Sequence, residues 1–349
     1  MKIAVLLSGG VDSSVVLALL KDQGHEVTAF YLKIWLEDEA AFLGDCPWQE
    51  DLAYARAVCR QLDVPLEVLS MQSEYYERVV RYALDELKAG RTPSSDIFCN
   101  QRIKFGVFYD HLDDGFEKVA TGHYAGLRYD GQGYHLLKGR DPVKDQTYFL
   151  SHLSQAQLQR ALFLLGDTTK AEVRDLARDF RLPTQQRKDS QGICFLGKID
   201  YDEFVRFNLG EQPGDIVEWP GDRVLGTHRG HWFYTIGQRQ GLRLSGGPWY
   251  VVGKDIERRI VYVTHAERLT QTSRDKFEVT ALHWITGEPS QRRLQVKLRH
   301  GPTLTGCRWE ARDAERWEVL LDEPDAGIAP GQFAVFYHNE ECLGAGMIN

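Results

Sequence analysis

The sequence predicts an α/β protein with an N-terminal parallel sheet that carries helices on both faces, followed by a small central domain and a C-terminal β-barrel. Up to about residue 200, short β-branched runs alternate with amphipathic stretches of helical spacing, which is typical of such a sheet. Beyond that point the chain consists of short aromatic-rich segments separated by glycine, which is typical of all-β domains. We therefore expect domains at residues 1–199, 200–270 and 271–349.

The N-terminal domain repeats a unit of one strand and one helix. Ile3–Leu7 is predicted to form a buried strand, Ser13–Gln23 a helix that Gly24 ends, and Val27–Leu32 the next strand. The remaining segments before residue 122 are predicted as helix Trp48–Asp63, strand Leu66–Leu69, helix Tyr75–Lys88, loop Arg91–Asn100, helix Ile103–Leu112 and strand Lys118–Thr121. The strands expected next are Asp215–Glu218, Trp232–Thr235, Tyr250–Val252 and Ile260–Thr264. Ligands of open parallel sheets bind where the strands end.

Composition and charge limit the kind of protein this can be. The 349 residues are 43% hydrophobic and 26% charged, which suits a folded chain with a proper core rather than a disordered one. The formal net charge of −8 argues against a protein that coats nucleic acid with a general basic field, so any RNA must be held by local patches. Charge alone is equally compatible with a partner that is only a small molecule.

The chain carries no sign of export. The apolar start is cut short at Ser8, so we expect no signal peptide, and no run of about 18 apolar residues predicts a membrane helix. We expect a cytoplasmic monomer. The six cysteines are too sparse for a disulfide scaffold and form no CxxC pair, so we expect reduced thiols and no metal site.

The segment SGGVDSS at residues 8–14 lies between a predicted strand and a predicted helix. Glycines in this position let consecutive backbone N–H groups converge on phosphate oxygens, and the helix N-terminus and the serine hydroxyls add to the attraction. It is not a Walker sequence, because no Gly-Lys-Ser/Thr follows. A Gly-Gly turn alone is most often structural, but the whole segment resembles the pyrophosphatase loop of ligases that cleave ATP to AMP and pyrophosphate. That resemblance implies adenylylation of a substrate oxygen.

Two cysteines occupy positions that suit nucleophilic chemistry. Cys99 is expected at the start of a helix, where the N-terminal field can lower the pKa of a thiol and expose a thiolate, and Asp96 beside it can handle a proton. Cys194 is expected in a glycine-bounded loop that permits movement. Taken singly, each cysteine is more simply an inert buried residue, and only their pairing favours catalysis. The other cysteines are expected to be structural: Cys46, Cys59, Cys307 and Cys342.

These segments together resemble the tRNA-specific 2-thiouridylases, over essentially the whole chain and in the same order. Further segments that carry the resemblance are Ala120–Tyr124, Lys144–Leu150, Thr235–Gly241 and Pro330–Gln332. The resemblance implies a catalytic domain of the PP-loop ATP pyrophosphatase type, a central tRNA-binding domain and a C-terminal barrel. The implied activity is ATP-dependent replacement of the C2 oxygen of the wobble uridine by sulfur in the tRNAs for lysine, glutamate and glutamine.

The resemblance also implies roles for individual residues. Cys194 receives a persulfide sulfur, Cys99 releases that sulfur or resolves a disulfide, and Asp96 assists proton transfer. The implied nucleotide contacts are Leu6, Leu7, Ser8, Gly9, Gly10, Val11, Asp12, Ser13, Leu32 and Gly122. The implied tRNA contacts are Ser94, Ser95, Asp96, His123, Lys144, Asp145, Gln146, Arg299, His300 and Gln332. The expected cofactors are ATP and Mg²⁺, and the expected partners are tRNA and a cysteine desulfurase or sulfur-relay protein that donates the persulfide.

The sequence departs from the family at two places. Ser94-Ser95 stands where the family usually has Asn-Pro, so this loop lacks the restraint of proline and an amide that could contact the base. His300 stands where many relatives have tyrosine, and either ring can stack on a base. Without the resemblance, His123 is equally well a structural histidine, and residues 144–146 and 299–300 are ordinary exposed segments.

In the implied reaction, a uridine taken out of the anticodon stack presents O2 to the α-phosphate of ATP, which makes AMP the leaving group at C2. Sulfur then reaches C2 either directly from the persulfide on Cys194 or as sulfide freed by Cys99, and the sequence leaves both routes open. Two other classes remain. A ligase acting on a small molecule, or making another thionucleoside, needs neither paired cysteines nor an anticodon-binding barrel. A non-catalytic RNA-binding protein would bind tRNA without releasing pyrophosphate.

Overall fold

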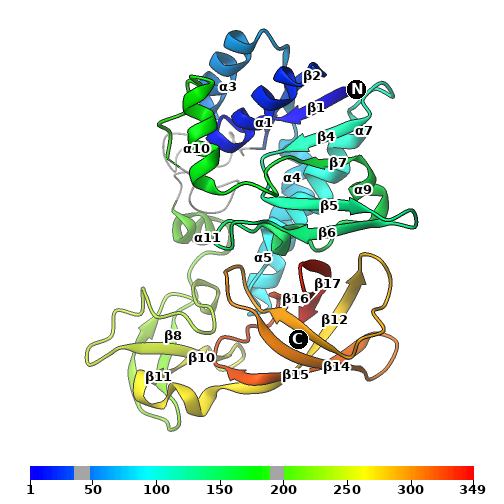
Figure 1. The fold of residues 1–349 in the computed structure, drawn as a ribbon. Helices are drawn as coiled ribbons and strands as arrows, with labels where there is room; N and C mark the ends of the chain where they lie inside the picture. Colours follow the sequence, from blue (N-terminus) through cyan, green and yellow to red (C-terminus); the bar gives the residue numbers. More distant parts are fainter. Residues whose placement is uncertain (35–47, 189–199) are drawn as a thin grey trace.

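The computed structural model describes residues 1–34, 48–188 and 200–349. They form a helix-covered parallel sheet, a small central β-sheet and a C-terminal barrel, with the parallel sheet above the two β domains in Figure 1. The predicted fold class is therefore confirmed. Cys46 and Cys194 lie outside the described residues. Within the described ranges, no helix is both long and apolar enough to cross a membrane.

The N-terminal sheet has five parallel strands in the order β3-β2-β1-β4-β7. Successive residues of the central strand β1 alternate between two buried clusters, with Ile3 and Val5 on one face and Ala4 and Leu6 on the other. Both faces are therefore covered. The chain order reverses between β1 and β4, so the carboxyl ends of these strands form a switch point. The strands are β1 (Lys2–Leu6), β2 (Glu26–Lys33), β3 (Leu66–Ser70), β4 (Lys118–Thr121) and β7 (Ala161–Phe163).

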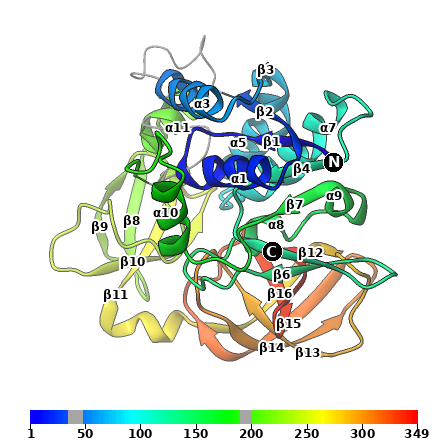
Figure 2. The same cartoon turned by 45° about the horizontal axis from the view of Figure 1, so that its top comes forward.

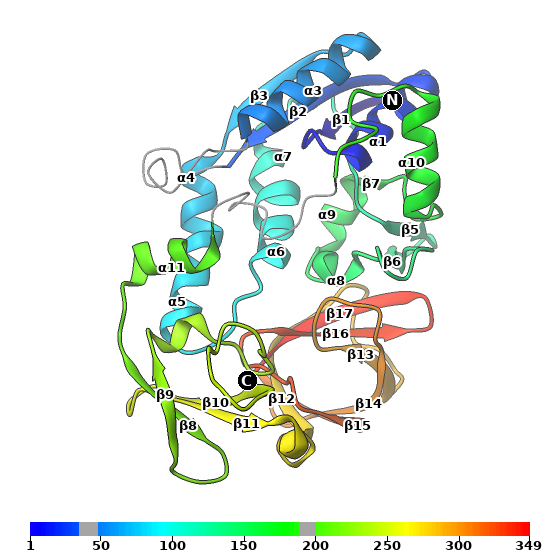
Figure 3. The same ribbon diagram turned by 90° about the vertical axis from the view of Figure 1, so that its left-hand side faces the viewer.

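Helices cover this sheet on both sides. One face packs against α1 (Val11–Asp22), α3 (Trp48–Leu62) and α10 (Lys170–Asp179), which lie together in Figure 2. The other face packs against two long helical segments, and the first of them descends toward the β domains in Figure 3. The first segment comprises α4 (Gln72–Tyr75), a π-helical turn (Tyr76–Val80) and α5 (Arg81–Lys88). The second comprises α6 (Ser95–Phe98), a π-helical stretch (Cys99–Val107) and α7 (Phe108–Asp110).

Two local predictions are wrong. The loop predicted over Arg91–Asn100 ends early, because α6 begins at Ser95. The ring of Phe98 packs edge-on against Tyr82 at 4.5 Å and Phe333 at 5.7 Å. This packing stabilises a helix that the low helix propensity of the serine-rich segment does not predict. The strand predicted over Trp232–Thr235 is instead a short 3₁₀ turn, η3 (His231–Phe233), whose aromatic rings pack into the core.

The two β domains form separate sheets. The central sheet has the order β10-β11-β8-β9, and the C-terminal sheet closes into a six-stranded barrel because β12 pairs with both β15 and β17. The central strands are β8 (Gly214–Glu218), β9 (Val224–His228), β10 (Trp249–Asp255) and β11 (Ile260–His265). The barrel strands are β12 (Arg274–Trp284), β13 (Arg293–Lys297), β14 (Thr305–Ala311), β15 (Arg316–Asp325), β16 (Phe333–His338) and β17 (Glu341–Ile348).

A hairpin from the N-terminal part of the chain extends the barrel sheet, which the sequence analysis did not foresee. Strands β5 (Ala125–Tyr129) and β6 (Tyr134–Lys138) pair with each other. Strand β6 then pairs with β17 through Leu137 opposite Glu341 and Leu136 opposite Cys342. The N-terminal domain is thus joined to the barrel by backbone hydrogen bonds as well as by side chains.

Candidate active site

The segment predicted to bind phosphate lies at the switch point of the parallel sheet. It leaves β1 after Leu6 and enters α1 at Val11, and Gly122 follows the end of the neighbouring strand β4. A Cβ atom on Gly122 would lie 2.8 Å from the backbone nitrogen of Ser13, so any side chain there would fill the space against the first turn of α1. The two strand ends therefore form one cradle.

The N-terminus of α1 suits a phosphate group. Its N-cap residue, Gly10, provides no side chain to hydrogen-bond the amides of the first turn. Gly9 has a φ of +78°, which glycine adopts without strain and which turns the chain from strand to helix. The hydroxyl groups of Ser8 and Ser13 lie 3.2 Å apart beside these amides. Amide and hydroxyl donors at a helix N-terminus are the groups that hold phosphate oxygens, so the cradle fits a nucleotide.

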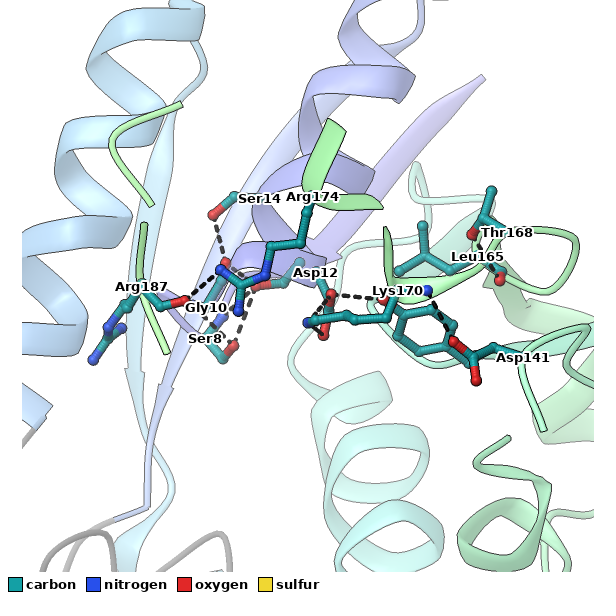
Figure 4. Close-up of polar contacts among 12 residues, drawn as sticks. Ser8, Gly10, Asp12, Ser14, Asp141, Leu165, Thr168, Lys170, Arg174 and Arg187 are labelled. Atoms are coloured by element: carbon teal, nitrogen blue, oxygen red, sulfur yellow. Dashed lines mark hydrogen bonds and ion pairs between the residues drawn. The ribbon is translucent and has the colours of Figure 1, made fainter. Parts of the chain in front are cut away.

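Asp12, in the first turn of α1, is held by two side chains that the sequence analysis missed. Lys170 places its Nζ atom 2.7 and 2.9 Å from the two carboxylate oxygens, as Figure 4 shows. The hydroxyl group of Tyr124 donates to one of the same oxygens over 2.8 Å. Arg187 donates to the carbonyl oxygen of Gly9 over 2.7 Å. Lys170 is 158 positions from Asp12, and no local pattern signals such a contact.

A groove of about 390 Å³ lies where the three domains meet. This volume falls within the range of small-molecule sites, roughly 300–1,000 Å³. The groove brings together five of the residues predicted to contact tRNA: Ser94, Ser95, Asp96, His300 and Gln332. Aromatic side chains that the sequence analysis did not single out also line it: Tyr148, Phe149, Tyr201, Trp232 and Phe233. Aromatic faces beside a carboxylate suit an unstacked base, which needs both a stacking surface and polar partners.

The rim of the groove carries His300 on the barrel side. Its ring lies 4.5 Å from that of Phe149 at an interplanar angle of 33°. Burial lowers the pKa of His300 and the charge of Lys297 lowers it further, so the ring is neutral near neutral pH. The neighbouring Arg299 is not among the described residues that line the groove. Its guanidinium binds the carboxylate of Asp325 through contacts of 2.6 and 3.3 Å.

Cys99 lies in the helical segment that starts at Ser95, and its side chain is only 1% exposed. The expectation that it begins a helix and presents an exposed thiolate is therefore wrong. The helix starts one turn earlier than predicted, so Cys99 is not in its first turn, and the side chain packs into the core with residues such as Val79 and Ile103. Asp96 lies in the turn before it and reaches the groove. Chemistry at Cys99 consequently requires this segment to open locally.

The remaining predicted tRNA contacts lie just after β4, at His123, and in the segment that follows β6, at Lys144, Asp145 and Gln146. His123 is buried, its Nδ1 atom lies 2.8 Å from the hydroxyl oxygen of Thr121, and burial lowers its pKa well below the ordinary value. Asp145 is also buried and binds Lys297 of the barrel. Gln146 exchanges hydrogen bonds of 3.0 and 3.1 Å with the backbone of Tyr124. The partly exposed Lys144 is the charged member of the segment that can approach a partner.

The other described cysteines have the properties of inert thiols. Cys59, Cys307 and Cys342 are buried and form no disulfide. Burial raises the pKa of Cys59 to about 11 and is the main cause that raises the pKa of Cys307 to about 12. Among the residues that the structure describes, no group of three or more histidine, cysteine or acidic side chains is placed to hold a metal ion.

A parallel sheet with a Ser-Gly-Gly turn and a helix N-terminus at its switch point defines an α/β nucleotide-binding domain, and the loop sequence places it in the PP-loop ATP pyrophosphatase class. Comparison with known proteins resolves the family. Residues 1–198 match the tRNA methyl transferase HUP domain, residues 202–265 the tRNA methyl transferase PRC-barrel domain, and residues 274–348 the aminomethyltransferase beta-barrel domain.

Relatives match over the whole chain. The tRNA-specific 2-thiouridylase MnmA 1 of Bacteroides thetaiotaomicron is 45% identical, and the MnmA proteins of Parabacteroides distasonis and Porphyromonas gingivalis are 44% and 41% identical. Each match covers 100% of this chain and 99% of the relative. The chain belongs to the tRNA-specific 2-thiouridylase family. Among solved structures, the U34-tRNA thiolase NcsA from Methanococcus maripaludis matches with 15% identity and a TM-score of 0.36 over 55% of this chain and 60% of that chain, which is too low to support an inference.

Proposed function

We propose that this protein is an ATP-dependent sulfurtransferase that replaces the C2 oxygen of the wobble uridine of tRNA with sulfur. The names of its full-length relatives support tRNA as the substrate. The observation that carries the proposal is the groove of about 390 Å³, where Asp96 meets aromatic side chains of the first two domains and His300 of the barrel. The division into residues 1–199, 200–270 and 271–349, the tRNAs for lysine, glutamate and glutamine, and a cysteine desulfurase or relay protein as sulfur donor belong to the same proposal.

The first step activates the base. Uridine O2 forms a bond to the α-phosphorus of ATP, the bond from that phosphorus to its bridging oxygen breaks, and the electron pair leaves with pyrophosphate. Asp96 accepts the N3 proton that the uridine loses, because it is the carboxylate that lines the groove on the Cys99 helix. The amides and hydroxyls of the loop at Ser8 hold the phosphates, and a magnesium ion that accompanies the nucleotide belongs to the same proposal.

The second step brings in sulfur. The terminal sulfur of a persulfide on Cys194 attacks C2, and the C2–O bond breaks with its electron pair going to AMP. The thiolate of Cys99 then attacks the Cys194 sulfur, which leaves the transferred sulfur on C2 and joins the cysteines in a disulfide. If Cys99 attacks first, it frees hydrosulfide, which attacks C2 instead. Either route ends with a disulfide that a two-electron thiol reductant must restore, and Cys99 must first leave its buried position.

Labelled sulfur separates the two cysteine roles. With a desulfurase and ³⁵S-cysteine, the Cys99→Ser protein should load label on Cys194 and make little 2-thiouridine, whereas Cys194→Ser should load none. The matched control is Cys59→Ser, another buried thiol, which should load and thiolate normally. Label on Cys99 in the Cys194→Ser protein, with thiolation preserved, would reverse the assignment. Unchanged 2-thiouridine in tRNA from cells lacking the protein would reject the proposed function itself.

A further inference from the structure

Helix α10 begins directly beside the phosphate cradle, and its start is firmly fixed. Thr169 is the N-cap, with its hydroxyl accepting from the amide of Glu172 and the Glu172 carboxylate accepting from the amide of Thr169. The first helical residue is Lys170, whose backbone N–H donates to the carboxylate of Asp141 over 2.9 Å. The backbone of Lys170 is therefore held from two sides, as Figure 4 shows for Asp141.

The side chain of Lys170 crosses from α10 to the first turn of α1. Its ammonium group contacts both carboxylate oxygens of Asp12, and the two side chains are only 16% and 30% exposed. Asp12 follows Gly10, the N-cap whose helix amides face the cradle, by two positions. The ammonium group thus lies at the mouth of the cradle in which the phosphates of the nucleotide are placed.

The charge of the Lys170 ammonium group favours phosphate binding in this position. A carboxylate in the first turn of α1 repels phosphate oxygens, and an ammonium group that binds the carboxylate removes most of that repulsion. Lysine carries three N–H donors on a flexible stem, so the group can keep one hydrogen bond to Asp12 while another turns to a phosphate oxygen. The hydroxyl group of Tyr124 still donates to Asp12 over 2.8 Å and holds the carboxylate during this turn.

We propose that Lys170 is a catalytic residue that contacts the β- and γ-phosphates of ATP and stabilises the charge of the departing pyrophosphate. The inference rests on the proposed function and deepens it, because it adds a cationic side chain to a site for which the sequence analysis named only amides, hydroxyls and a carboxylate of the protein. As the bond between the α-phosphorus and its bridging oxygen breaks, the electron pair moves onto pyrophosphate, and Lys170 places a positive charge next to that developing negative charge.

The surroundings of Lys170 also connect it to the segment predicted to contact tRNA. The carboxylate of Asp141 that accepts from Lys170 accepts from the amides of Val143 and Lys144 as well, over 3.0 and 3.2 Å. A tRNA that binds near Lys144 would therefore lie next to a carboxylate that also fixes the backbone of Lys170. This places the lysine where contact with tRNA and release of pyrophosphate can be coupled.

The test compares the full-length protein with Lys170→Met, Lys170→Arg and a control, Arg178→Met. Arg178 is on the same helix, but its guanidinium pairs with Asp175 and both side chains are more than half exposed. Three quantities are measured: the dissociation constants of Mg-ATP and of AMP, and the single-turnover rate of pyrophosphate release with tRNA. We expect Lys170→Met to slow pyrophosphate release by about 10²- to 10³-fold and to raise the dissociation constant of Mg-ATP, while the dissociation constant of AMP is unchanged. Lys170→Arg should keep part of the rate, and Arg178→Met all of it.

The comparison of ATP with AMP decides between a phosphate contact and a structural ion pair. If Lys170 only holds Asp12 in place, Lys170→Met loses ATP and AMP affinity equally, and the inference is overturned. Unchanged pyrophosphate release in Lys170→Met would overturn it as well. If the unmodified protein releases no pyrophosphate with tRNA, the proposed function fails, and the two dissociation constants still decide whether Lys170 contacts the phosphates.

Discussion

The carboxylate of Asp145 and the ammonium group of Lys297 lie 2.7 Å apart, and each side chain is only 3% exposed. Asp145 comes from the segment that follows the β5–β6 hairpin, and Lys297 ends barrel strand β13. The other oxygen of the carboxylate accepts from the hydroxyl group of Thr147 over 2.8 Å and from the amide of Gly139 over 3.2 Å. A buried ion pair whose carboxylate is hydrogen-bonded at both oxygens therefore joins the N-terminal domain to the barrel.

Removing one partner of this pair should destabilise the protein strongly. Lys297→Met leaves the Asp145 carboxylate buried without its counter-charge, which typically costs about 3–5 kcal/mol. Urea unfolding followed by fluorescence measures the loss. Replacing both partners, as Asp145→Leu with Lys297→Met, should recover part of it, because no lone charge then remains in the interior. An equal free energy of unfolding for Lys297→Met and the unmodified protein would show that water reaches the Asp145 carboxylate.

His135 should make stability depend on pH. Its ring lies 2.7 Å from Glu341 of β17 and 2.8 Å from Asp130 in the β5–β6 turn. Burial opposes the charged form, but hydrogen bonds and attraction from the two carboxylates outweigh it and raise the pKa of His135. A raised folded-state pKa contributes stability that is complete below the unfolded value, about 6.5, and is lost as pH rises through the folded value.

The variant His135→Gln should accordingly lower the melting temperature most at pH values below the unfolded-state pKa of histidine, with the difference shrinking as pH rises through the raised folded-state pKa. The control is His111→Gln, at an exposed histidine after α7, which should give no comparable trend. A difference that grows with rising pH would contradict the assignment of a charged imidazole between the two carboxylates.

Arg299 should contribute to tRNA affinity through a phosphate contact. Arg299→Ala is expected to weaken tRNA binding and to reduce the slope of log affinity against log salt by about one. The matched control is Arg316→Ala, since Arg316 pairs with Asp313 at 2.6 Å as Arg299 pairs with Asp325, with 54% and 51% of the arginine side chains exposed. Filter binding over a salt series measures both. If the two variants lose the same affinity, the Arg299 end of the barrel makes no special contact.

Gly331 should be required for the groove to form correctly. It has a φ of +89°, and a Cβ atom there would lie 2.8 Å from both the carbonyl oxygen of Thr92 and the Cβ of Arg91. Gly331→Ala should push the segment before Asp96 off the barrel and slow thiolation by roughly 10- to 100-fold, while Mg-ATP binding is unchanged.

Gly287→Ala separates this clash from backbone strain. Gly287 has a similar φ of +94°, but nothing lies within 4 Å of the position of its Cβ atom. Both substitutions should cost about 1 kcal/mol or more in unfolding free energy for the left-handed backbone, and only Gly331→Ala should slow thiolation. Equal activities would mean that the contact with Thr92 does not position the groove.

The sequence predicted the elements whose formation depends on neighbouring residues in the chain. Strand β1 and the loop at Ser8 follow from an apolar run and two glycines, and the structure places both where the sequence analysis expected them. The helix at Ser95 was missed because Ile97 and Phe98 are ordered by partners elsewhere in the chain. No pattern of spacing reveals such partners.

The candidate site divides in the same way. The implied groove residues Asp96, His300 and Gln332 do meet, although nothing local to any of them indicates this. The aromatic residues that surround them, and Lys170 beside Asp12, are recognisable only after folding, since ordinary core packing uses the same residue types. The family resemblance predicted Asp96, His300 and Gln332, whereas the aromatic residues and Lys170 are recognised only in the folded structure.

The pairing of β6 with β17 also bears on the order in which the protein can be completed during synthesis. The hairpin emerges from the ribosome with the N-terminal domain, but its partner Glu341–Ile348 follows more than 200 residues later in the chain. Until then the edge of β6 at Leu136 and Leu137 has unpaired backbone groups, the kind of edge that invites association between chains. A ribosome stalled just short of Glu341 would therefore hold a chain in which this edge of β6 is still open to association with another chain.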